Sequence, residues 1–593
     1  MLCEANVEKI SMKNLYRYLN GKKKEIEKGI PTYLYQKDFV DGTYLIGKPG
    51  YYVLKEDIVF NPNPNDDYRP REDQVKYKLP GFVLGFFAVI AIYADGVYLD
   101  LNGFEIKASK EFTLQQRFFS IIELANAPFV FKEGPGTFST ATSFVPATNT
   151  IVRNGKLGLS SHHGIHGGMC SNILLEKLSI ENFEFVGVAL NGCHSILAHK
   201  VMIKNNRQDI PVLATYSAAR FAVQFAKRVL SMSQLNASQK SELTRRVSLL
   251  QNGMDNTFRE IMASGKTSSK LFRNESGLAD GNIYGFLVKN RGLAVDELVT
   301  PDPSVIKTRN VFLRKVHLEN LVCRVDEILG ISQKGGLGIQ VDTAGAVLQI
   351  DHIKDLLGVY KGNVLSDVQL YLAELASSLN IPIGKINITS DVVEWSKSGQ
   401  SIDTLIEKGY FFKTGSDSMF HFSKGNISYR FDAIDNLVLE KCSFYKVKNF
   451  ARMGCDFPNS KIDEVNRRNG HYPGASSTGL NLAYCSDVLI RDFVGKKIFS
   501  KDGDAIGFRA MFGSENVRLD EVELVNIKAG TLYRGNWIGK SYTGKKVPYT
   551  DNPPNRRPQA VGIKYDNNAI IDMKDVEIYD LKSCEQEEKI LKL

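Results

Sequence analysis

The chain has 593 residues, and its 75 lysine and arginine residues exceed its 66 aspartate and glutamate residues by nine. Hydrophobic residues make up 43% and charged residues 24% of the composition, which is typical of a packed globular chain. These values exclude a wholly disordered chain, a collagen and a short disulfide-rich scaffold. The net charge of +9 is mild for a chain of this length and does not by itself identify a partner.

The N-terminal segment, residues 1–40, is predicted to form a helical cap over the open end of a core. It carries the basic sequence GKKKEIEKG from Gly21. The first residues, MLCEANVEKISMKN, lack the basic and then apolar pattern of a secretory signal peptide, so we expect no export by that route. The eight cysteines form no CxxC motif, and we expect them to be reduced and packed in the core.

One apolar run, LPGFVLGFFAVIAIYA from Leu79, was compared with a membrane span. It is too short to cross a bilayer, and it contains Pro80, Gly81 and Gly85. We therefore expect buried strands here and no membrane span.

An internal repeat is the main signal for the fold. Apolar residues recur at offsets 0, +2, +5 and +7 from a first position, and the alternation within each pair predicts short strands joined by turns. The repeats begin at Ile173, Ile196, Val311, Leu437, Val488, Val517 and Ile571.

Two other residue types keep the same register. A glycine often stands nine residues before the first position, as at Gly164, Gly187, Gly479 and Gly562. Nine residues after it there is often Asn or Asp, which tolerate the left-handed conformation of a corner and can stack in hydrogen-bonded ladders. This second set is Asn182, Asn205, Asn320, Asn526 and Asp580.

A unit of roughly 23 residues with three short strands is typical of one coil of a right-handed parallel β-helix, or β-solenoid, in which neighbouring coils stack. The alternative is a β-sandwich or propeller, whose strands are usually longer and joined by hairpins. We therefore predict a mainly β fold, a right-handed parallel β-helix with an N-terminal cap and inserted α-helices. Cys170 and Cys193 lie one repeat apart and are expected to stack.

The same residues carry a resemblance to known proteins. The sequence VYLDLNGFEI from Val97 resembles the opening coil of pectin-lyase-like right-handed β-helix proteins. The repeats GIHGGMCSNILLEKLSIENF and GVALNGCHSILAHKVMIKNN resemble those of β-helix proteins encoded by large DNA viruses of algae and amoebae. The resemblance covers about residues 40–205 and 420–582. It implies the fold and leaves the activity open, because such proteins include lyases, hydrolases, epimerases, viral fibres and tailspikes.

Helical patterns interrupt the coils. Leu243, Val247, Leu250, Met254, Phe258 and Ile261 follow helical spacing, and a second helix is predicted over Ser217–Met232. A smaller helix is predicted around residues 365–379. Such insertions either shield a flank of the β-helix or contact another subunit, as in a trimer. The predicted organisation is 1–40 cap, 41–214 coils, 215–262 helical hairpin, 263–420 coils with the smaller helix, and 421–593 coils with long loops.

Histidines cluster in the sequence SSHHGIH, from Ser160 to His166. His162, His163 and His166 could include a general base or metal ligands. No carboxylate is close in the sequence, and alternate residues of a strand face opposite ways. These points favour a corner or an exposed face over catalysis or metal binding.

A second candidate is the sequence KDGD from Lys501. Asp502 and Asp504 could face the same side of a strand, as acid and base work on a glycosidic bond requires, with Arg509 close by. The β-helix hydrolases of pectin also have a Gly-His-Gly and a basic triplet, which this chain lacks in order. In β-helix lyases an Arg or Lys base acts beside acidic groups that often hold calcium. A turn formed by Asp-Gly-Asp is the alternative.

Two long loops late in the chain are the third candidate. They combine aromatic residues, which can stack on sugar rings, with basic residues, which can pair with acidic substituents. Solvated loops without a ligand are the alternative, and no nucleic-acid-binding module is recognised in them. The candidate glycan or partner residues are His471, Tyr472, Arg467, Arg468, Trp537, Tyr542 and Lys545.

The function that we predict is a non-catalytic structural or attachment protein, a virion component of a large DNA virus assembled in the host cytoplasm. Its partners would be glycans or other virion proteins, in a homo-oligomer such as a trimer, with no nucleic acid. The alternative is a polysaccharide-active lyase or hydrolase that uses Asp502, Asp504, Arg509 or His166. We expect no metal or cofactor, except calcium if the protein is a lyase.

Overall fold

The computed structural model describes most of the N-terminal half of the β-helix and the stacked strands of the rest. The described residues are 9–78, 80–82, 85–115, 119–128, 144–205, 237–264, 283–289, 308–323, 334–339, 410–414, 420–424, 427–429, 434–449, 477–483, 485–500, 504–511, 514–530, 538–540, 546–548, 559–566, 569–583 and 586–592. The predicted helix over Ser217–Met232 and the helix around residues 365–379 lie outside them.

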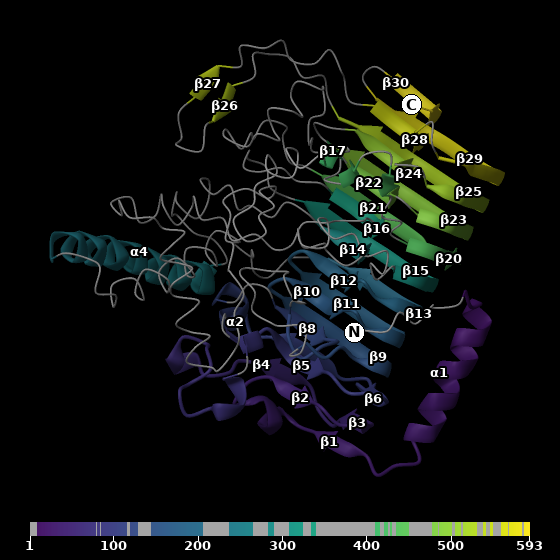
Figure 1. Ribbon diagram of the computed structural model, residues 1–593. Coiled ribbons are helices and arrows are strands. Elements are labelled where there is room, and N and C mark those ends of the chain that lie inside the picture. The colour runs from purple at the N-terminus through teal and green to yellow at the C-terminus, as the bar shows by residue number, and fades with distance from the viewer. Residues whose placement is uncertain are drawn as a thin grey trace.

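Two large sheets form the body of the molecule, and the strands described within each of them pair in parallel. Successive strands of one sheet alternate along the chain with strands of the other, so each circuit of the chain adds one coil to a right-handed parallel β-helix. Figure 1 shows the coils stacked in chain order from the N-terminal to the C-terminal strands. The predicted fold class is confirmed.

The first sheet has 14 strands and contains the long strands of each coil. It consists of β1 Thr32–Leu34, β3 Gly50–Leu54, β4 Ile58–Phe60, β6 Val97–Asp100, β7 Glu105–Ala108, β9 Thr148–Ser160, β11 Ser171–Phe183, β13 His194–Lys204, β15 Thr308–Cys323, β20 Ile434–Glu440, β21 Ser443–Asn449, β23 Cys485–Ser500, β25 Glu515–Ala529 and β29 Ile571–Lys582.

The second sheet has 11 strands, most of them short. It consists of β2 Tyr44–Ile46, β5 Ala88–Ile92, β8 Ser120–Glu123, β10 His163–Gly168, β12 Val186–Asn191, β14 Tyr284–Lys289, β16 Lys334–Ile339, β22 Ser477–Ala483, β24 Ala505–Met511, β28 Gln559–Tyr565 and β30 Gln586–Lys592. The buried strand β5 lies in the apolar run from Leu79, as expected.

Helices and smaller strands lie outside this body. The helices are α1 Met12–Ile26, α2 Lys110–Gln115 and α4 Ala237–Ser264, and the 3-10 turns are η1 Gln36–Phe39, η2 Pro64–Asp66, η3 Val75–Tyr77 and η4 Pro80–Phe82. The remaining strands are β17 Tyr410–Thr414, β18 Phe420–Lys424, β19 Ile427–Tyr429, β26 Ile538–Lys540 and β27 Lys546–Pro548. The helix expected from Leu243 to Ile261 is confirmed as α4. Among the described helices, none is long and apolar enough to cross a membrane.

The repeat positions stack in the register that the sequence predicts. Ile173 lies opposite Ile196, and Ile196 lies opposite Val311 in the next coil. The same position continues through Leu437, Val488, Val517 and Ile571. These side chains face the core between the two sheets, where all but the last are fully buried.

The corners of each long strand have left-handed residues at intervals of five. In β11 they are Asn172, Lys177 and Asn182, with φ of 55°, 53° and 56°. The expected corner at the Asn182 position is confirmed, and it recurs at Asn320, Asn526 and Asp580. Hydrogen bonds between stacked side chains occur at the Asn172 position, which precedes the first apolar residue: Asn172 Nδ2 donates to Asn149 Oδ1 over 3.1 Å.

The glycines of the repeat form a column in the second sheet where this sheet closely approaches the first. A Cβ atom on Gly187 would lie 2.6 Å from the carbonyl oxygen of Gly285 and 2.4 Å from Ile203 Cγ2. The strand register stacks Gly164, Gly187, Gly285, Gly479, Gly507 and Gly562 in this column. No larger residue fits at this contact without displacing the backbone of the next coil.

The helix α1 packs on the outer face of the first sheet, where Figure 1 shows it crossing the flank of the stacked coils. Leu15 and Leu19 are buried against outward-facing apolar residues of successive coils. This stripe consists of Tyr98, Ile151, Leu174, Leu197 and Phe312. The helical start predicted for residues 1–40 is therefore present, but α1 covers a flank, and β1 forms the first strand of the sheet.

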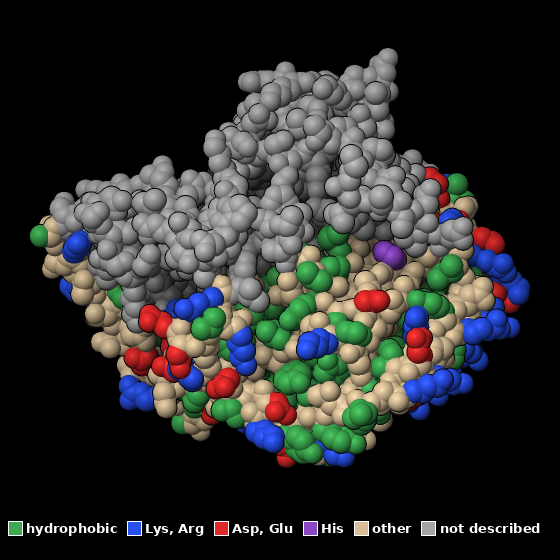
Figure 2. All heavy atoms as spheres, turned by 60° about the horizontal axis from the view of Figure 1, so that its bottom comes forward, with side chains coloured by type: hydrophobic (Ala, Val, Ile, Leu, Met, Phe, Trp, Pro, Cys, Tyr) green, Lys and Arg blue, Asp and Glu red, His purple; other side chains and the backbone are tan. Residues whose placement is uncertain are grey.

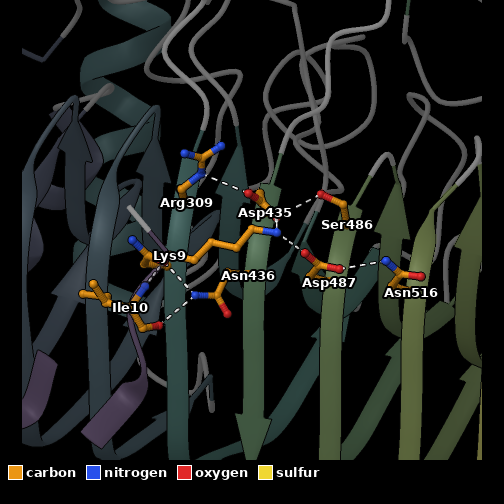
Figure 3. Close-up of polar contacts among 9 residues, drawn as sticks. Lys9, Ile10, Arg309, Asp435, Asn436, Ser486, Asp487 and Asn516 are labelled. Atoms are coloured by element: carbon orange, nitrogen blue, oxygen red, sulfur yellow. Dashed lines mark hydrogen bonds and ion pairs between the residues drawn. The ribbon is translucent and has the colours of Figure 1, made fainter. Parts of the chain in front are cut away.

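The residues before α1 extend this contact to later coils. Figure 3 shows Lys9 reaching Asp435 of β20 and Asp487 of β23. The backbone of Ile10 also binds neighbouring coils, because its N–H donates to Asn310 Oδ1 and its carbonyl oxygen accepts from Asn436 Nδ2. The segment thus joins β15, β20 and β23, which are far apart in the sequence.

Candidate functional site

The three predicted histidines lie together at the start of one strand of the second sheet. His162 is in the corner between β9 and β10, and His163 and His166 belong to β10. The ring centroids of His162 and His163 are 4.1 Å apart, and those of His163 and His166 are 5.0 Å apart. The corner turns the chain, so His162 is not on the opposite side from its neighbour as a straight strand would require.

Two carboxylates from neighbouring coils join the histidines. His166 Nδ1 is 2.8 Å from both carboxylate oxygens of Glu123, the last residue of β8. His162 Nδ1 is 3.3 Å from Glu184 Oε2, in the corner between β11 and β12. Glu123 and Glu184 are 1% and 2% exposed. The carboxylates that are missing near the histidines in the sequence are therefore supplied by other coils.

Asn191 of β12 completes the surroundings of His166. Its Nδ2 lies 3.3 Å from His166 Nε2. This pattern fits an imidazole that donates from Nδ1 to Glu123 and whose Nε2 accepts a hydrogen bond from Asn191 Nδ2. Among the described residues, Asn191 Oδ1 and Ser161 Oγ are buried without a hydrogen-bond partner. Buried polar atoms of this kind often bind water or a ligand.

Aromatic rings line the same corner. The ring of Phe185 stacks on that of His162, with centroids 5.1 Å apart, and lies 5.8 Å from the ring of Tyr284 in β14. The site thus combines basic, acidic, amide and aromatic groups. No group of three or more His, Cys, Asp or Glu side chains suited to hold a metal ion occurs in the described part of the chain.

The second candidate lies on the same sheet, several coils further along. Asp504 Oδ2 is 3.6 Å from Lys564 Nζ, and its Oδ1 accepts a hydrogen bond from the N–H of Gln559 over 3.0 Å. Arg509 Nε donates to Asn481 Oδ1 over 2.7 Å. Asp504 therefore holds a lysine and the start of β28, a role that the sequence did not predict.

One row of the second sheet connects the two clusters. Strand pairing places His166 in line with Glu123 on one side and Ala189 on the other. The row then continues through Leu287, Gly338, Asn481, Arg509 and Lys564. Ala189 and Leu287 belong to a buried cluster separate from the main core, so the row faces away from that core. Most of its polar residues are nevertheless covered, with exposures of 1% for Glu123, 9% for His166, 5% for Asn481 and 6% for Lys564.

The two clusters do not converge on one point. Five strand spacings separate His166 from Arg509, roughly 24 Å at about 4.8 Å for each spacing. A small substrate cannot contact both residues, whereas an extended molecule along the axis of the β-helix can. The geometry is therefore that of two separate clusters along one row and not of one active site built from both candidates.

The other predicted site residues cannot be placed. Asp502, Arg467, Arg468, His471, Tyr472, Trp537, Tyr542 and Lys545 lie outside the described residues. Their assignment to catalysis or to a glycan or partner stays a prediction.

The sequence did not indicate Glu123, Glu184 or Asn191. Residues 129–143 lengthen the coil between Glu123 and His166 to 43 residues, so the repeat of roughly 23 does not align the pair. Glu184 is 22 residues after His162 and is close to one repeat away. This spacing was a usable signal for the second pair.

Comparisons with known proteins do not assign this chain to a family. No protein-family model matches the chain, and no curated protein sequence matches it. Among solved structures, the chain is similar to the catalytic domain of Agl-KA, with 8% identity, 98% of this chain and 66% of that chain covered, and a TM-score of 0.26. The chain thus spans just under two thirds of that structure.

Two further structures are similar to the chain. PfbA, a surface adhesin of Streptococcus pneumoniae, is 8% identical, with 97% of this chain and 89% of that chain covered and a TM-score of 0.25. The catalytic domain of a GH87 alpha-1,3-glucanase in complex with nigerose is 10% identical, with 98% and 67% covered and a TM-score of 0.21. Likenesses at these TM-scores carry no argument about function.

Proposed function

We propose that this protein is a carbohydrate-binding β-helix protein of the structural or attachment type. It would hold an extended acidic glycan along the outer face of its second sheet. The observation that carries this proposal is the single outward row of side chains from Glu123 and His166 to Arg509 and Lys564. This row follows the axis of the β-helix, with polar groups at its two ends and Ala189, Leu287 and Gly338 between them.

The chemistry of the row suits sugars. Sugar hydroxyls donate and accept hydrogen bonds, and His166, Asn191 and Asn481 offer both kinds of partner. Arg509 and Lys564 lie opposite each other on β24 and β28 near one end of the row. Asp504 pairs with Lys564, so one positive charge remains in excess there. A sugar carboxylate or sulfate would bind there through charge-assisted hydrogen bonds.

A polysaccharide-active enzyme is the second candidate, favoured by the contact between His166 and Glu123. A buried carboxylate that orients a histidine through Nδ1 raises the basicity of Nε2 and stabilises the protonated ring. His166 could thus remove a proton from a bound sugar or activate a water molecule.

Placement in a virus particle stays a prediction from the repeats at Gly164 and Gly187, as does a homo-oligomer. Attachment to other virion proteins would use the same solenoid as a rigid support. Glycan binding is compatible with a place in a virus particle and with a homo-oligomer, and it requires neither.

The test measures binding of the full chain to immobilised polygalacturonate, alginate and dextran. We expect binding to the acidic polymers, with at least a tenfold loss of affinity in Arg509→Gln. The matched control is Arg491→Gln, which removes an exposed arginine from the outer face of the first sheet. Absence of binding to all three polymers, or equal loss in both variants, would contradict the proposal.

The same samples test the enzyme candidate. New reducing ends or unsaturated products that disappear in His166→Gln, with binding retained, would identify His166 as a general base. Binding without any product would leave the attachment function as the better description.

A further inference from the structure

Two cysteines of successive coils lie close together in the core. Cys170 follows β10, and Cys193 follows β12 at the equivalent place one coil later. Their Sγ atoms are 3.1 Å apart, and both side chains are fully buried. The sequence predicted this stacking from the spacing of 23 residues.

The geometry is close to that of a disulfide. Adjacent in-register strands hold their Cα atoms about 4.8 Å apart, within the range of about 4.4–6.8 Å that disulfides span. The Sγ atoms are about 1 Å further apart than the ~2.05 Å of an S–S bond. Rotation of the two side chains would have to bring the sulfurs about 1 Å closer to form the bond.

We propose that Cys170 and Cys193 form a disulfide that cross-links these two coils beside the histidine site. Because both thiols are fully buried, local opening of these coils must first expose one of them. With oxidised glutathione as the oxidant, the thiolate of that cysteine attacks a glutathione sulfur, and the other glutathione leaves as a thiolate. The second cysteine then attacks the mixed disulfide, so an S–S bond forms in the protein. Two thiols are oxidised and one glutathione disulfide is reduced to two thiols.

The present contacts of the pair affect the rate of this reaction. Cys193 Sγ lies 3.3 Å from the carbonyl oxygen of Gly167, to which it donates as a thiol. Burial raises the pKa of Cys170, which keeps its thiolate scarce. The disulfide should therefore form slowly at neutral pH and faster as the pH rises.

The cross-link would act on the neighbouring site. Cys170 and Cys193 follow the strands that carry His166 and Asn191, and the bond would fix the ends of these strands to each other. The distance between His166 Nε2 and Asn191 Nδ2, now 3.3 Å, would vary less in the oxidised protein. This restriction of the His166–Asn191 distance does not depend on whether the site binds a glycan.

The test is a non-reducing peptide map of the full chain after long incubation with oxidised glutathione. We expect one linked peptide pair that contains Cys170 and Cys193, a mass lower by two hydrogens, and loss of two of the eight thiols. Both residues still free, or each carrying only glutathione, would overturn the proposal. The map of the unmodified sequence decides this even if a variant fails to fold.

Stability provides a second measurement. Oxidation should raise the unfolding midpoint of the wild-type chain by about 2–4 °C, because the bond constrains the unfolded chain. The shift should vanish in Cys170→Ser and persist in Cys442→Ser, whose buried cysteine belongs to a different coil. An equal shift in both variants would also overturn the assignment.

Discussion

At the scale of single residues, the fold depends on side chains that are small or that tolerate a left-handed backbone. Lys177 and its equivalents Lys200, Lys315 and Lys441 are left-handed although lysine rarely adopts this conformation. Each is followed by an apolar residue that faces the core, as Lys177 is followed by Leu178. The core contacts of the next residue therefore determine the left-handed backbone at this corner, and the intrinsic preference of lysine does not.

The column of glycines gives a residue-scale prediction. Gly187→Ala should lower the free energy of unfolding by about 1–3 kcal/mol, because its Cβ would press on the carbonyl of Gly285. Gly253→Ala, in the exposed helix α4, has nothing within 4 Å of the new Cβ and should stabilise α4 by about 0.5–1 kcal/mol. Chemical denaturation of both variants checks the sign of each change. A neutral Gly187→Ala would refute the close packing of Gly187 against Gly285 of the next coil and Ile203 of the first sheet.

The contacts of the N-terminal segment predict a pH dependence. The hydrogen bond from Lys9 lowers the pKa of Asp487 below its ordinary value of 3.8. Glu176 accepts a hydrogen bond from the Tyr16 hydroxyl of α1 over 3.4 Å, and its hydrogen bond with His199 lowers its pKa below 4.5. A carboxylate with a lowered folded-state pKa stabilises the folded chain above its unfolded pKa, and this contribution is lost as the pH falls through the folded value. We therefore expect the segment to detach below about pH 4 and to stay bound between pH 5 and 8.

Limited proteolysis across this pH range, with an acid-active protease, measures the detachment. Lys9→Met should shift the onset of cleavage in residues 9–26 to higher pH, whereas Lys24→Met, at an exposed position of α1, should not. Cleavage independent of pH would show that these ion pairs do not hold the segment.

At the scale of elements, charged and apolar residues form separate rows on the outer face of the first sheet. One row runs through Arg153, Glu176, His199, Arg314, Glu440, Arg491, Asp520 and Lys574. Opposite charges meet within it, with 3.5 Å between Arg153 and Glu176 and 3.1 Å between Arg491 and Glu440. The apolar stripe lies beside this row and is covered by α1.

The position of α1 could have been predicted from the repeats. The residue after the first apolar position is also apolar at Leu174, Leu197 and Phe312, and it becomes Arg518 in a later coil. An outward apolar residue in every early coil requires a cover, and α1 supplies it with Leu15 and Leu19. The coils and their register followed from local spacing, whereas the partners of His166 depended on an insertion that spacing cannot bridge.

The packing of α1 gives an element-scale prediction. Leu19→Ala should lower the free energy of unfolding or of helix docking by about 2–5 kcal/mol, because Leu19 is fully buried on the stripe. Lys24→Ala, an exposed change on the same helix, should have an effect within about 0.5 kcal/mol. Hydrogen exchange of α1 measures the loss of helix docking, and binding of a hydrophobic dye measures exposure of the uncovered stripe. Equal protection of α1 in both variants would contradict the proposed packing.

At the scale of the whole molecule, the two sheets present different outer faces. The first is covered in part by α1 and has neutralised rows of charge, whereas the second carries the histidine site and the Arg509–Lys564 cluster. Figure 2 shows positive and negative side chains interspersed with hydrophobic ones over the described part of one end of the molecule.

The central claim is that an acidic glycan binds along this row of the second sheet. Hydrogen–deuterium exchange in the presence of polygalacturonate tests it most directly. We expect the polymer to slow exchange in β10, β12, β22, β24 and β28 and to leave β11 and β23 of the first sheet unchanged. Slower exchange in the first sheet alone, or no change at a polymer concentration that saturates binding, would contradict a glycan path along this face.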